Sequence, residues 1–306
     1  MRTWRIGILI DGGFFLKRLP ALVDPRRCAT PGNVVACLRH LCRNHVKNLT
    51  GTSDALWHQH VYRIFYYDSV PYDGKAHHPI DNRPIDFAKT DVARFRSEMF
   101  DILRKQRKVA LRLGKVNRES DWSFNPGLTK KILRTKSAVT ALDALGAEAD
   151  LTSDSDALTL TLSARQARDL IRMRDFWQSL EGNSVSLGLK QKGVDMRIGI
   201  DIASMTLKRQ VDTIVLVSGD SDFVPAGKLA RREGVELILD PLWQQINDDL
   251  HEHIDGLHSG IAKPKPKAVA ENPSSPQPIV VNPDALLDGT APSAAASDSD
   301  ISEART

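Results

Sequence analysis

Short apolar runs alternate with longer amphipathic segments over the first 261 residues of the chain. The runs are rich in β-branched and aromatic residues and are bounded by Asp, Gly or Pro, a pattern that is typical of buried strands. Strands are therefore predicted at Trp4 to Ile10, Val61 to Tyr67, Val109 to Leu113, Thr213 to Val217 and Val235 to Leu239.

The segments between these runs carry apolar residues at a spacing of three or four, as at Phe95, Met99 and Leu103, which predicts helices. Short strands that alternate with helices indicate an α/β fold with a mostly parallel sheet covered on both faces. The polar stretch 117–160 shows no such period and is left unassigned. Helices are predicted at 33–46, 87–106, 164–180 and 225–232.

The segment 193–205 fits two periods. As a helix it would place Ile198, Ile202 and Met205 on one apolar stripe and Asp195 in its first turn, where the helix dipole tolerates an anion. As a strand it would place Asp195 and Asp201 on one face. The residue pattern alone leaves both open.

Residues 262–306 differ in composition from the rest of the chain. They hold seven of the sixteen prolines and no aromatic residue, and they are rich in Ala, Ser and Asp. Such a segment buries too little apolar surface to offset the entropy of ordering, so a disordered tail is predicted, which is either passive or binds a protein partner. The predicted organisation is a domain at 1–261, with an insertion of uncertain structure around 70–185, followed by this tail.

Composition narrows the class of protein. A chain with 41% hydrophobic and 26% charged residues is globular rather than disordered throughout, and no apolar run approaches the roughly 18 residues that a membrane span needs. Three cysteines suit a reducing compartment better than a disulfide framework, so a soluble, cytoplasmic protein is expected. Residues 1–261 carry a net charge of +6, which is compatible with a polyanionic partner.

Two cysteines and two histidines crowd into nine residues of the predicted helix 33–46. Thiolates and imidazoles suit Zn²⁺, but one helix cannot aim four side chains at a single tetrahedral point. We therefore expect buried cysteines and surface histidines here rather than a zinc site. The residues are Cys37, His40, Cys42 and His45.

Carboxylates follow the predicted strands. Asp11 ends the first strand, and Asp220 and Asp222 come directly after the strand 213–217. Ligands of parallel α/β sheets bind beyond the carboxyl ends of the strands, so these groups are expected to meet, together with Asp195. Each could instead only cap a turn or a helix start. Converging carboxylates repel one another, and a hard divalent cation, Mg²⁺ or Mn²⁺, relieves that repulsion.

The same residues resemble a known family. The segments Ile8 to Asp11, Val61 to Asp68, Lys192 to Asp201 and above all Val215 to Pro225 are similar to the NYN domain, a PIN-like group of ribonucleases that includes the LabA-like branch. The resemblance implies a Rossmann-like three-layer α/β/α sandwich and favours the helical form of 193–205. It also implies a metal-dependent ribonuclease in which Asp11, Asp195, Asp220 and Asp222 are catalytic and bind the metal, with Asp201 as a further, weaker ligand.

Several other residues are candidates for substrate binding. Ser218 either bonds a phosphate or stabilises its turn, and Lys192 either neutralises a phosphate or is solvated. Phe14 and Tyr67 are candidates for stacking on bases, and Tyr67 has core packing as its alternative. Single-stranded RNA is the favoured substrate, and a homo-oligomer is compatible with the sequence. On the helix 164–180, one face carries Arg165, Arg168 and Arg172, which suit RNA phosphates.

Two rival functions remain open at this point. An Asp-x-Asp pair after a strand also occurs in Toprim-type and phosphatase-like phosphotransfer enzymes, although those usually present a Glu after the first strand. The acidic pocket could alternatively be idle in a module that only binds RNA or protein. The products of cleavage and the effect of EDTA on RNA binding distinguish a ribonuclease from these two rival functions.

Overall fold

The computed structural model describes residues 4–139 and 162–263. They divide into two compact units: residues 4–123 with 187–263, and residues 124–139 with 162–186. The predicted disordered tail lies outside the described residues, apart from Ala262 and Lys263, as do residues 140–160 of the unassigned stretch 117–160.

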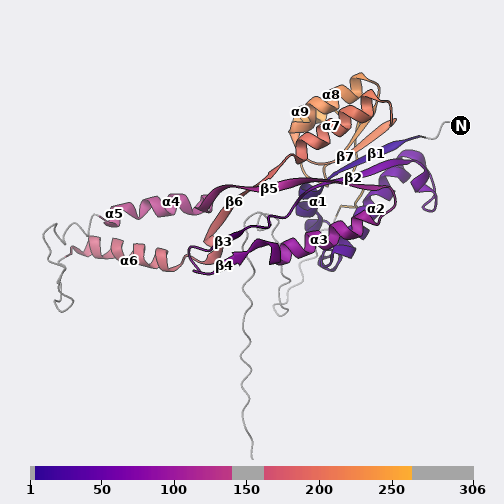
Figure 1. Cartoon of the computed structure of the whole chain (residues 1–306). Coiled ribbons are helices and arrows are strands. Elements are labelled where there is room, and N and C mark those ends of the chain that lie inside the picture. The colour runs from indigo at the N-terminus through magenta and orange to yellow at the C-terminus, as the bar shows by residue number, and fades with distance from the viewer. Residues whose placement is uncertain (1–3, 140–161, 264–306) are drawn as a thin grey trace, which may run out of the picture. The chain divides into compact units, whose positions relative to one another are not determined.

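The first unit is built on a seven-stranded sheet with the order β6-β5-β2-β1-β7-β8-β9 (Figure 1). Each neighbouring pair from β5 to β9 is parallel. The mostly parallel α/β sheet predicted from the sequence is therefore confirmed. Its strands are β1 (Ile6–Asp11), β2 (Val61–Val70), β5 (Val109–Phe124), β6 (Val185–Lys192), β7 (Thr213–Val217), β8 (Glu236–Asp240) and β9 (Gly256–Leu257).

Helices cover both faces of this sheet. One face packs on α1 (Gly12–Arg18), α2 (Pro31–Thr50) and α3 (Asp91–Arg104), and the other on α7 (Val194–Leu207) and α8 (Val224–Arg232), as Figure 1 shows. The remaining elements of this unit are a hairpin of β3 (Lys75–His77) and β4 (Pro84–Asp86), α9 (Asp248–Glu252), and the short 3₁₀ turns η1 (Leu19–Ala21), η2 (Pro25–Arg27), η3 (Trp57–Gln59), η4 (Phe87–Lys89) and η7 (Ser221–Phe223).

The alternation of side chains along each strand produces the two cores. In β1, Ile6, Ile8 and Ile10 join the core on the α1–α3 side, while Leu9 joins the core under α7 and α8. Successive residues of a strand point to opposite faces, so a continuous apolar run is what a strand buried on both faces requires. The result is the three-layer α/β/α sandwich that the sequence motifs implied.

The second unit is helical in its described residues. It contains α4 (Pro126–Arg134), α5 (Lys136–Val139), α6 (Ala164–Gln178) and the turn η6 (Gly182–Ser184). Helix α6 begins with a capping box in which Ser163 and Gln166 satisfy each other's backbone amides. The unassigned stretch 117–160 therefore contains regular structure as far as it is described, namely the end of β5, α4 and α5.

The predicted division of helix α2 into buried cysteines and surface histidines holds only in part. Cys37 and Cys42 are buried, as expected, but His45 is buried as well, at 1% exposure. His45 finds a hydrogen-bond partner in Asp240 of β8, which a helical pattern alone does not reveal.

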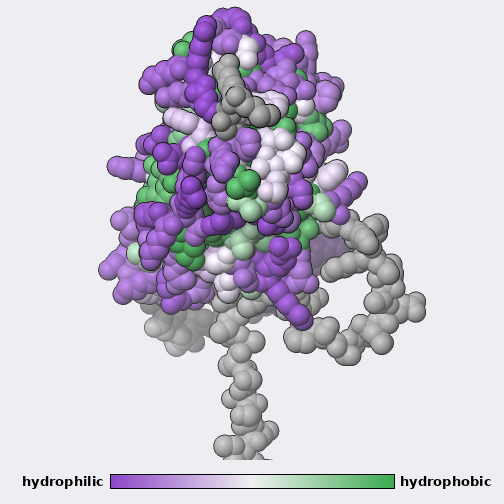
Figure 2. Space-filling model, turned by 90° about the vertical axis from the view of Figure 1, so that its right-hand side faces the viewer, coloured by the Kyte–Doolittle hydropathy of each residue, from purple (hydrophilic) through white to green (hydrophobic). Residues whose placement is uncertain are grey.

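One face of the surface can be followed in Figure 2. The face shown in Figure 2 is largely hydrophilic, with apolar areas between the charged groups. Among the described residues, no helix has the length and apolar character that crossing a membrane requires.

Candidate active site

The strands that carry the predicted acidic residues lie next to one another at the centre of the sheet. Ile10 of β1 is level with Val217, the last residue of β7, and Asp11 is level with Tyr67 of β2. The chain runs from β1 outward to β2 and β5 on one side, and to β7 and β8 on the other. The topological switch point of the sheet therefore falls between β1 and β7, where ligands of open α/β sheets bind.

Asp11 occupies this switch point. Its Oδ1 accepts a hydrogen bond of 3.0 Å from the backbone N–H of Phe14 and so caps the N-terminus of α1. The pKa of Asp11 is raised to about 6, mainly by burial and also by the negative charges of Asp195, Asp68 and Asp220, while the bond from Phe14 acts to lower it. The acids whose charges act on Asp11 thus come from three other places in the fold, namely α7, β2 and the turn after β7.

Asp195 lies at the start of helix α7, which follows the edge strand β6. Gly193 turns the chain from β6 into α7 with φ +79°, a left-handed conformation that glycine adopts without strain. Asp195 then lies in the first turn of α7. Burial, followed by the charges of Asp220 and Asp222, raises the pKa of Asp195. The helical alternative for 193–205, which the family resemblance favoured, is the observed one.

Asp220 and Asp222 form the turn that follows β7. Oδ1 of Asp220 accepts a hydrogen bond of 3.0 Å from the backbone N–H of Asp222 and begins η7. Ser218, which is fully buried, accepts a bond of 3.3 Å from the backbone N–H of Asp220. Ser218 thus stabilises the turn, one of the two roles that the sequence left open. Both Asp side chains remain exposed to solvent.

The chemistry of this group suits a hard divalent cation. Within the described part of the chain, no Lys, Arg or His forms an ion pair with Asp11, Asp195, Asp220 or Asp222. Their mutual repulsion is therefore not relieved by protein cations, and carboxylate oxygens are the ligands that Mg²⁺ and Mn²⁺ prefer. Among the described residues, no three of these acids have oxygens that all lie within 4.8 Å of one another. This suits Mg²⁺, which keeps several waters.

A fifth acid, Asp68, was not among the site residues predicted from the sequence. It follows Tyr67 at the point where β2 passes the end of β1, and it is fully buried. Arg96 of α3 pairs with it, and the backbone N–H of Ser69 donates to its Oδ1 at 2.7 Å. Because Asp68 has a cationic partner, it adds negative potential behind Asp11 but is not a free ligand. Its position after a strand was the available signal.

Asp201 and Tyr67, two further residues predicted from the sequence, contact each other. Oδ2 of Asp201 accepts hydrogen bonds from the hydroxyl of Tyr67 at 2.8 Å and from Nε of Arg112 at 3.0 Å. The ring of Tyr67 is fully buried in the core under α7, which fits core packing rather than stacking on a base. The carboxylate of Asp201 is therefore bound by two protein donors rather than left unpaired for a metal ion.

The other predicted substrate contacts divide by location. Phe14 is half-buried, and a Cβ placed on Gly219 would lie 3.0 Å from its ring, so the ring lies against the turn that carries Asp220. The ammonium group of Lys192 instead pairs with Glu119. The arginines Arg165, Arg168 and Arg172 are exposed on α6, in the second unit.

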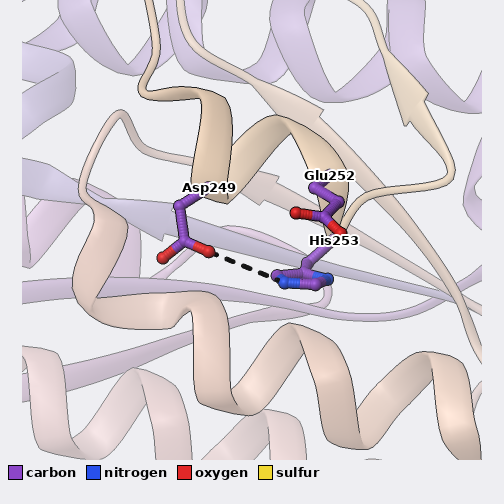
Figure 3. Close-up of side chains that lie close together, drawn as sticks. All are labelled: Asp249, Glu252 and His253. Carbon is purple, nitrogen blue, oxygen red and sulfur yellow. Dashed lines mark ion pairs between the residues drawn. The ribbon is translucent and has the colours of Figure 1, made fainter.

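A further group of candidate ligands lies on α9 (Figure 3). Carboxylate oxygens of Asp249 and Glu252 and a ring nitrogen of His253 lie within 4.8 Å of one another. Nε2 of His253 is 3.6 Å from Oδ1 of Asp249. This group comes from one short helical segment, with two of its members already paired, whereas the acids around Asp11 come from separate elements.

Comparison with known family models supports the resemblance seen in the motifs. The family model of the NYN domain matches residues 142–258. The NYN resemblance predicted from the motifs is therefore confirmed. The match includes Asp195, Asp220 and Asp222, and the sheet places Asp11, which precedes it in the chain, in the same group. Neither the curated proteins nor the solved structures include a match to the chain.

Proposed function

We propose that this protein is a metal-dependent ribonuclease that hydrolyses RNA phosphodiester bonds at the acidic group of Asp11, Asp195, Asp220 and Asp222. One observation carries the proposal: four carboxylates from three different parts of the sheet edge interact with one another. Burial raises the pKa of Asp11 to about 6 with a contribution from the charges of Asp195 and Asp220, and the charges of Asp220 and Asp222 add to the effect of burial on Asp195. The NYN match supports nuclease chemistry for this group, because NYN domains are PIN-like nucleases.

The residues present fit Mg²⁺ or Mn²⁺, which would supply a Lewis acid for the phosphate and a water of lowered pKa. The protein's own contribution is to hold the carboxylate ligands in place. Asp11 is fixed by its bond to the N–H of Phe14, and Asp220 by its bond to the N–H of Asp222. Among the described residues, the second oxygen of each of these carboxylates accepts no hydrogen bond, and neither oxygen of Asp195 or Asp222 does, so these oxygens could bind the cation. Fixed ligands of this kind need little reorganisation when substrate arrives.

The test is cleavage of single-stranded RNA, structured RNA and DNA with Mn²⁺, comparing the wild type with the double variant Asp220→Asn, Asp222→Asn. We expect RNA cleavage by the wild type, and a loss of at least about a hundredfold in the variant because two ligands lose their charge. The matched control is Asp91→Asn, Asp101→Asn, which makes the same charge change at exposed positions of α3 and should cleave normally.

Three results would contradict the proposal. Undiminished cleavage by the folded double variant would remove these acids from catalysis. RNA binding that EDTA does not affect, with no product, would instead indicate a binding module. Release of phosphate from monoesters without strand cleavage would indicate a phosphatase-like enzyme.

A further inference from the structure

Gln191 lies beside the acidic group, although the sequence did not mark it. It is the penultimate residue of β6, and its Nε2 is buried with no hydrogen-bond partner among the described residues. A Cβ placed on Gly13 would lie 3.8 Å from Oε1 of Gln191 and 3.5 Å from Oδ1 of Asp11. The carboxamide therefore reaches the start of α1, next to the carboxylate at the switch point.

The alternation of β6 explains why Gln191 and not Lys192 faces this point. Lys190 and Lys192 lie two residues apart, and both ammonium groups pair with Glu119. Gln191, between them, projects to the opposite side of the strand. The charge of Lys192 made it the candidate from the sequence. The alternation of side chains along β6 instead directs the side chain of Gln191 toward the acidic group.

The backbone holds Gln191 in this position. A Cβ on Gly114 of β5 would lie only 2.5 Å from the carbonyl oxygen of Lys192, so the end of β6 approaches β5 more closely than any other residue at position 114 would allow. One residue later, Gly193 turns the chain into α7 and brings in Asp195. The same turn thus delivers an acid and an amide to one site.

A buried N–H without an acceptor costs free energy, and such a group usually has a partner in the functional state. We propose that Gln191 is a substrate-binding residue whose carboxamide turns out of its buried position when RNA binds, so that Nε2 donates a hydrogen bond to a non-bridging oxygen of the RNA phosphate held beside Asp11. The inference rests on the proposed function. A neutral amide is suited to this place because a Lys or Arg would pair with Asp11 and compete with the metal ion.

The decisive variant is Gln191→Met, which keeps the length of the side chain and removes its donor. We expect affinity for single-stranded RNA, measured by fluorescence anisotropy with Ca²⁺ in place of Mg²⁺, to fall roughly ten- to a hundredfold. The melting temperature should stay the same or rise, because an apolar group replaces an unpaired amide. A purely structural role would instead lower the melting temperature and leave affinity unchanged.

Two further variants complete the experiment. Gln59→Met is the matched control, since Gln59 is exposed in η3 at the opposite end of β2, and its RNA affinity should equal that of the wild type. Gln191→Glu keeps the shape but replaces the donor with a charge that repels phosphate, so its loss should be larger. It also answers the question if the Met variant does not fold.

The result separates this inference from the function on which it rests. If the wild type cleaves RNA and both Gln191 variants bind RNA as tightly as the wild type, the role of Gln191 is refuted and the ribonuclease proposal stands. If the wild type neither binds nor cleaves RNA with any divalent ion, the ribonuclease proposal fails and the role of Gln191 fails with it.

Discussion

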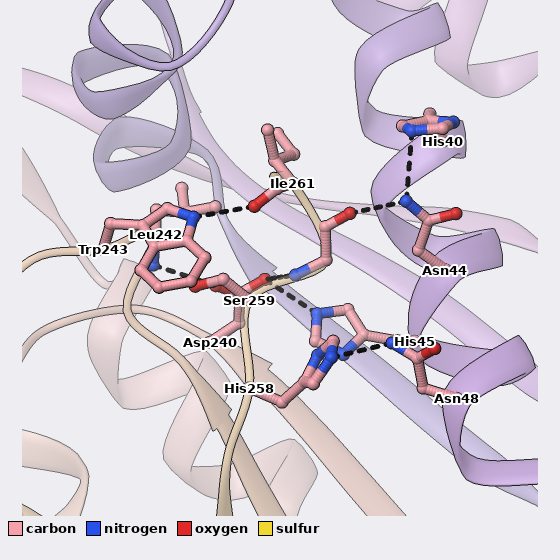
Figure 4. Close-up of polar contacts among 11 residues, drawn as sticks. His40, Asn44, His45, Asn48, Asp240, Leu242, Trp243, His258, Ser259 and Ile261 are labelled. Atoms are coloured by element: carbon pink, nitrogen blue, oxygen red, sulfur yellow. Dashed lines mark hydrogen bonds and ion pairs between the residues drawn. The ribbon is translucent and has the colours of Figure 1, made fainter. Parts of the chain in front are cut away.

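Nε2 of His45 lies 2.7 Å from Oδ2 of Asp240, and both side chains are excluded from solvent. His45 belongs to α2 and Asp240 ends β8, so one contact joins residues 195 positions apart. The same carboxylate accepts hydrogen bonds of 2.9 Å from the backbone N–H groups of Leu242 and Gly260 and from the hydroxyl of Ser259 (Figure 4). A single buried acid thus joins α2, the end of the sheet and the segment after β9.

This contact predicts a large loss of stability when it is broken. Burial alone would raise the pKa of Asp240, but the hydrogen bond and charge of His45, followed by the bonds from Gly260 and Leu242, lower it below its usual range. Asp240→Ala leaves these buried donors without an acceptor, so we expect the free energy of unfolding to fall by about 3–5 kcal/mol. Urea unfolding followed by circular dichroism measures the change.

A surface pair supplies the control. Asp101 and Arg104 form an exposed ion pair on α3, and Asp101→Ala should cost less than about 1 kcal/mol. If Asp240→Ala cost no more than this control, the buried contact would not stabilise the fold as proposed.

The raised pKa of Asp11 predicts that the acidic group destabilises the metal-free protein. Its pKa rises from 3.8 to about 6 on folding, so the folded state holds this proton more tightly than the unfolded state. Stability from this group is therefore lost as the pH rises from about 4 to about 6, and the full penalty remains above that range. Asp11→Asn removes the charge and keeps a good helix cap.

We accordingly expect Asp11→Asn to raise the free energy of unfolding of the metal-free protein by about 1–3 kcal/mol at pH 7.5 while abolishing cleavage. Thermal or urea unfolding in EDTA, repeated from pH 3.5 to pH 8, measures it. The gain should disappear below about pH 4, where the wild-type carboxyl is protonated in both states. A variant that is less stable than the wild type at every pH would contradict the electrostatic origin of the shift.

The contrast between Asp11 and Asp240 shows which features of a carboxylate can be predicted from the sequence. The position of Asp11 follows from local rules, because an apolar run that ends in Asp predicts a strand and places the acid at its carboxyl end. Asp240 also ends a strand, yet its partner His45 is distant in sequence and lies on a helix whose pattern predicted surface histidines. Whether a carboxylate stays unpaired depends on how distant segments of the chain pack together. The local spacing of apolar residues carries no information about such packing.

Gln191 and Asp201 illustrate the same limit. Charge and motif position favoured Lys192 and made Asp201 a ligand candidate, but the pairs Lys192–Glu119 and Asp201–Arg112 satisfy both charges elsewhere. In the same way, polar residues of β5 hid the second half of that strand, which continues to Phe124 rather than ending at Leu113. An exposed polar strand lacks the apolar run that marks a buried one.

The structure offers two places for a divalent cation, and metal-induced stabilisation distinguishes them. A ligand that binds only the folded state at 100 times its Kd stabilises it by about 2.7 kcal/mol, which corresponds to a rise of several degrees in melting temperature. If Mn²⁺ binds at the strand ends, this rise should disappear in the variant Asp195→Asn, Asp220→Asn. It should persist in His253→Gln, which alters only the group on α9.

Two controls make the assignment specific. Asp201→Asn should keep the rise, because Tyr67 and Arg112 already occupy its carboxylate. The rise should also be smaller at pH 5.5 than at pH 7.5, since a proton on Asp11, with a pKa of about 6, competes with the ion. A rise that is lost in His253→Gln and kept in Asp195→Asn, Asp220→Asn would place the cation on α9. The concentration of negative charge at the centre of the sheet would then not be explained by metal binding.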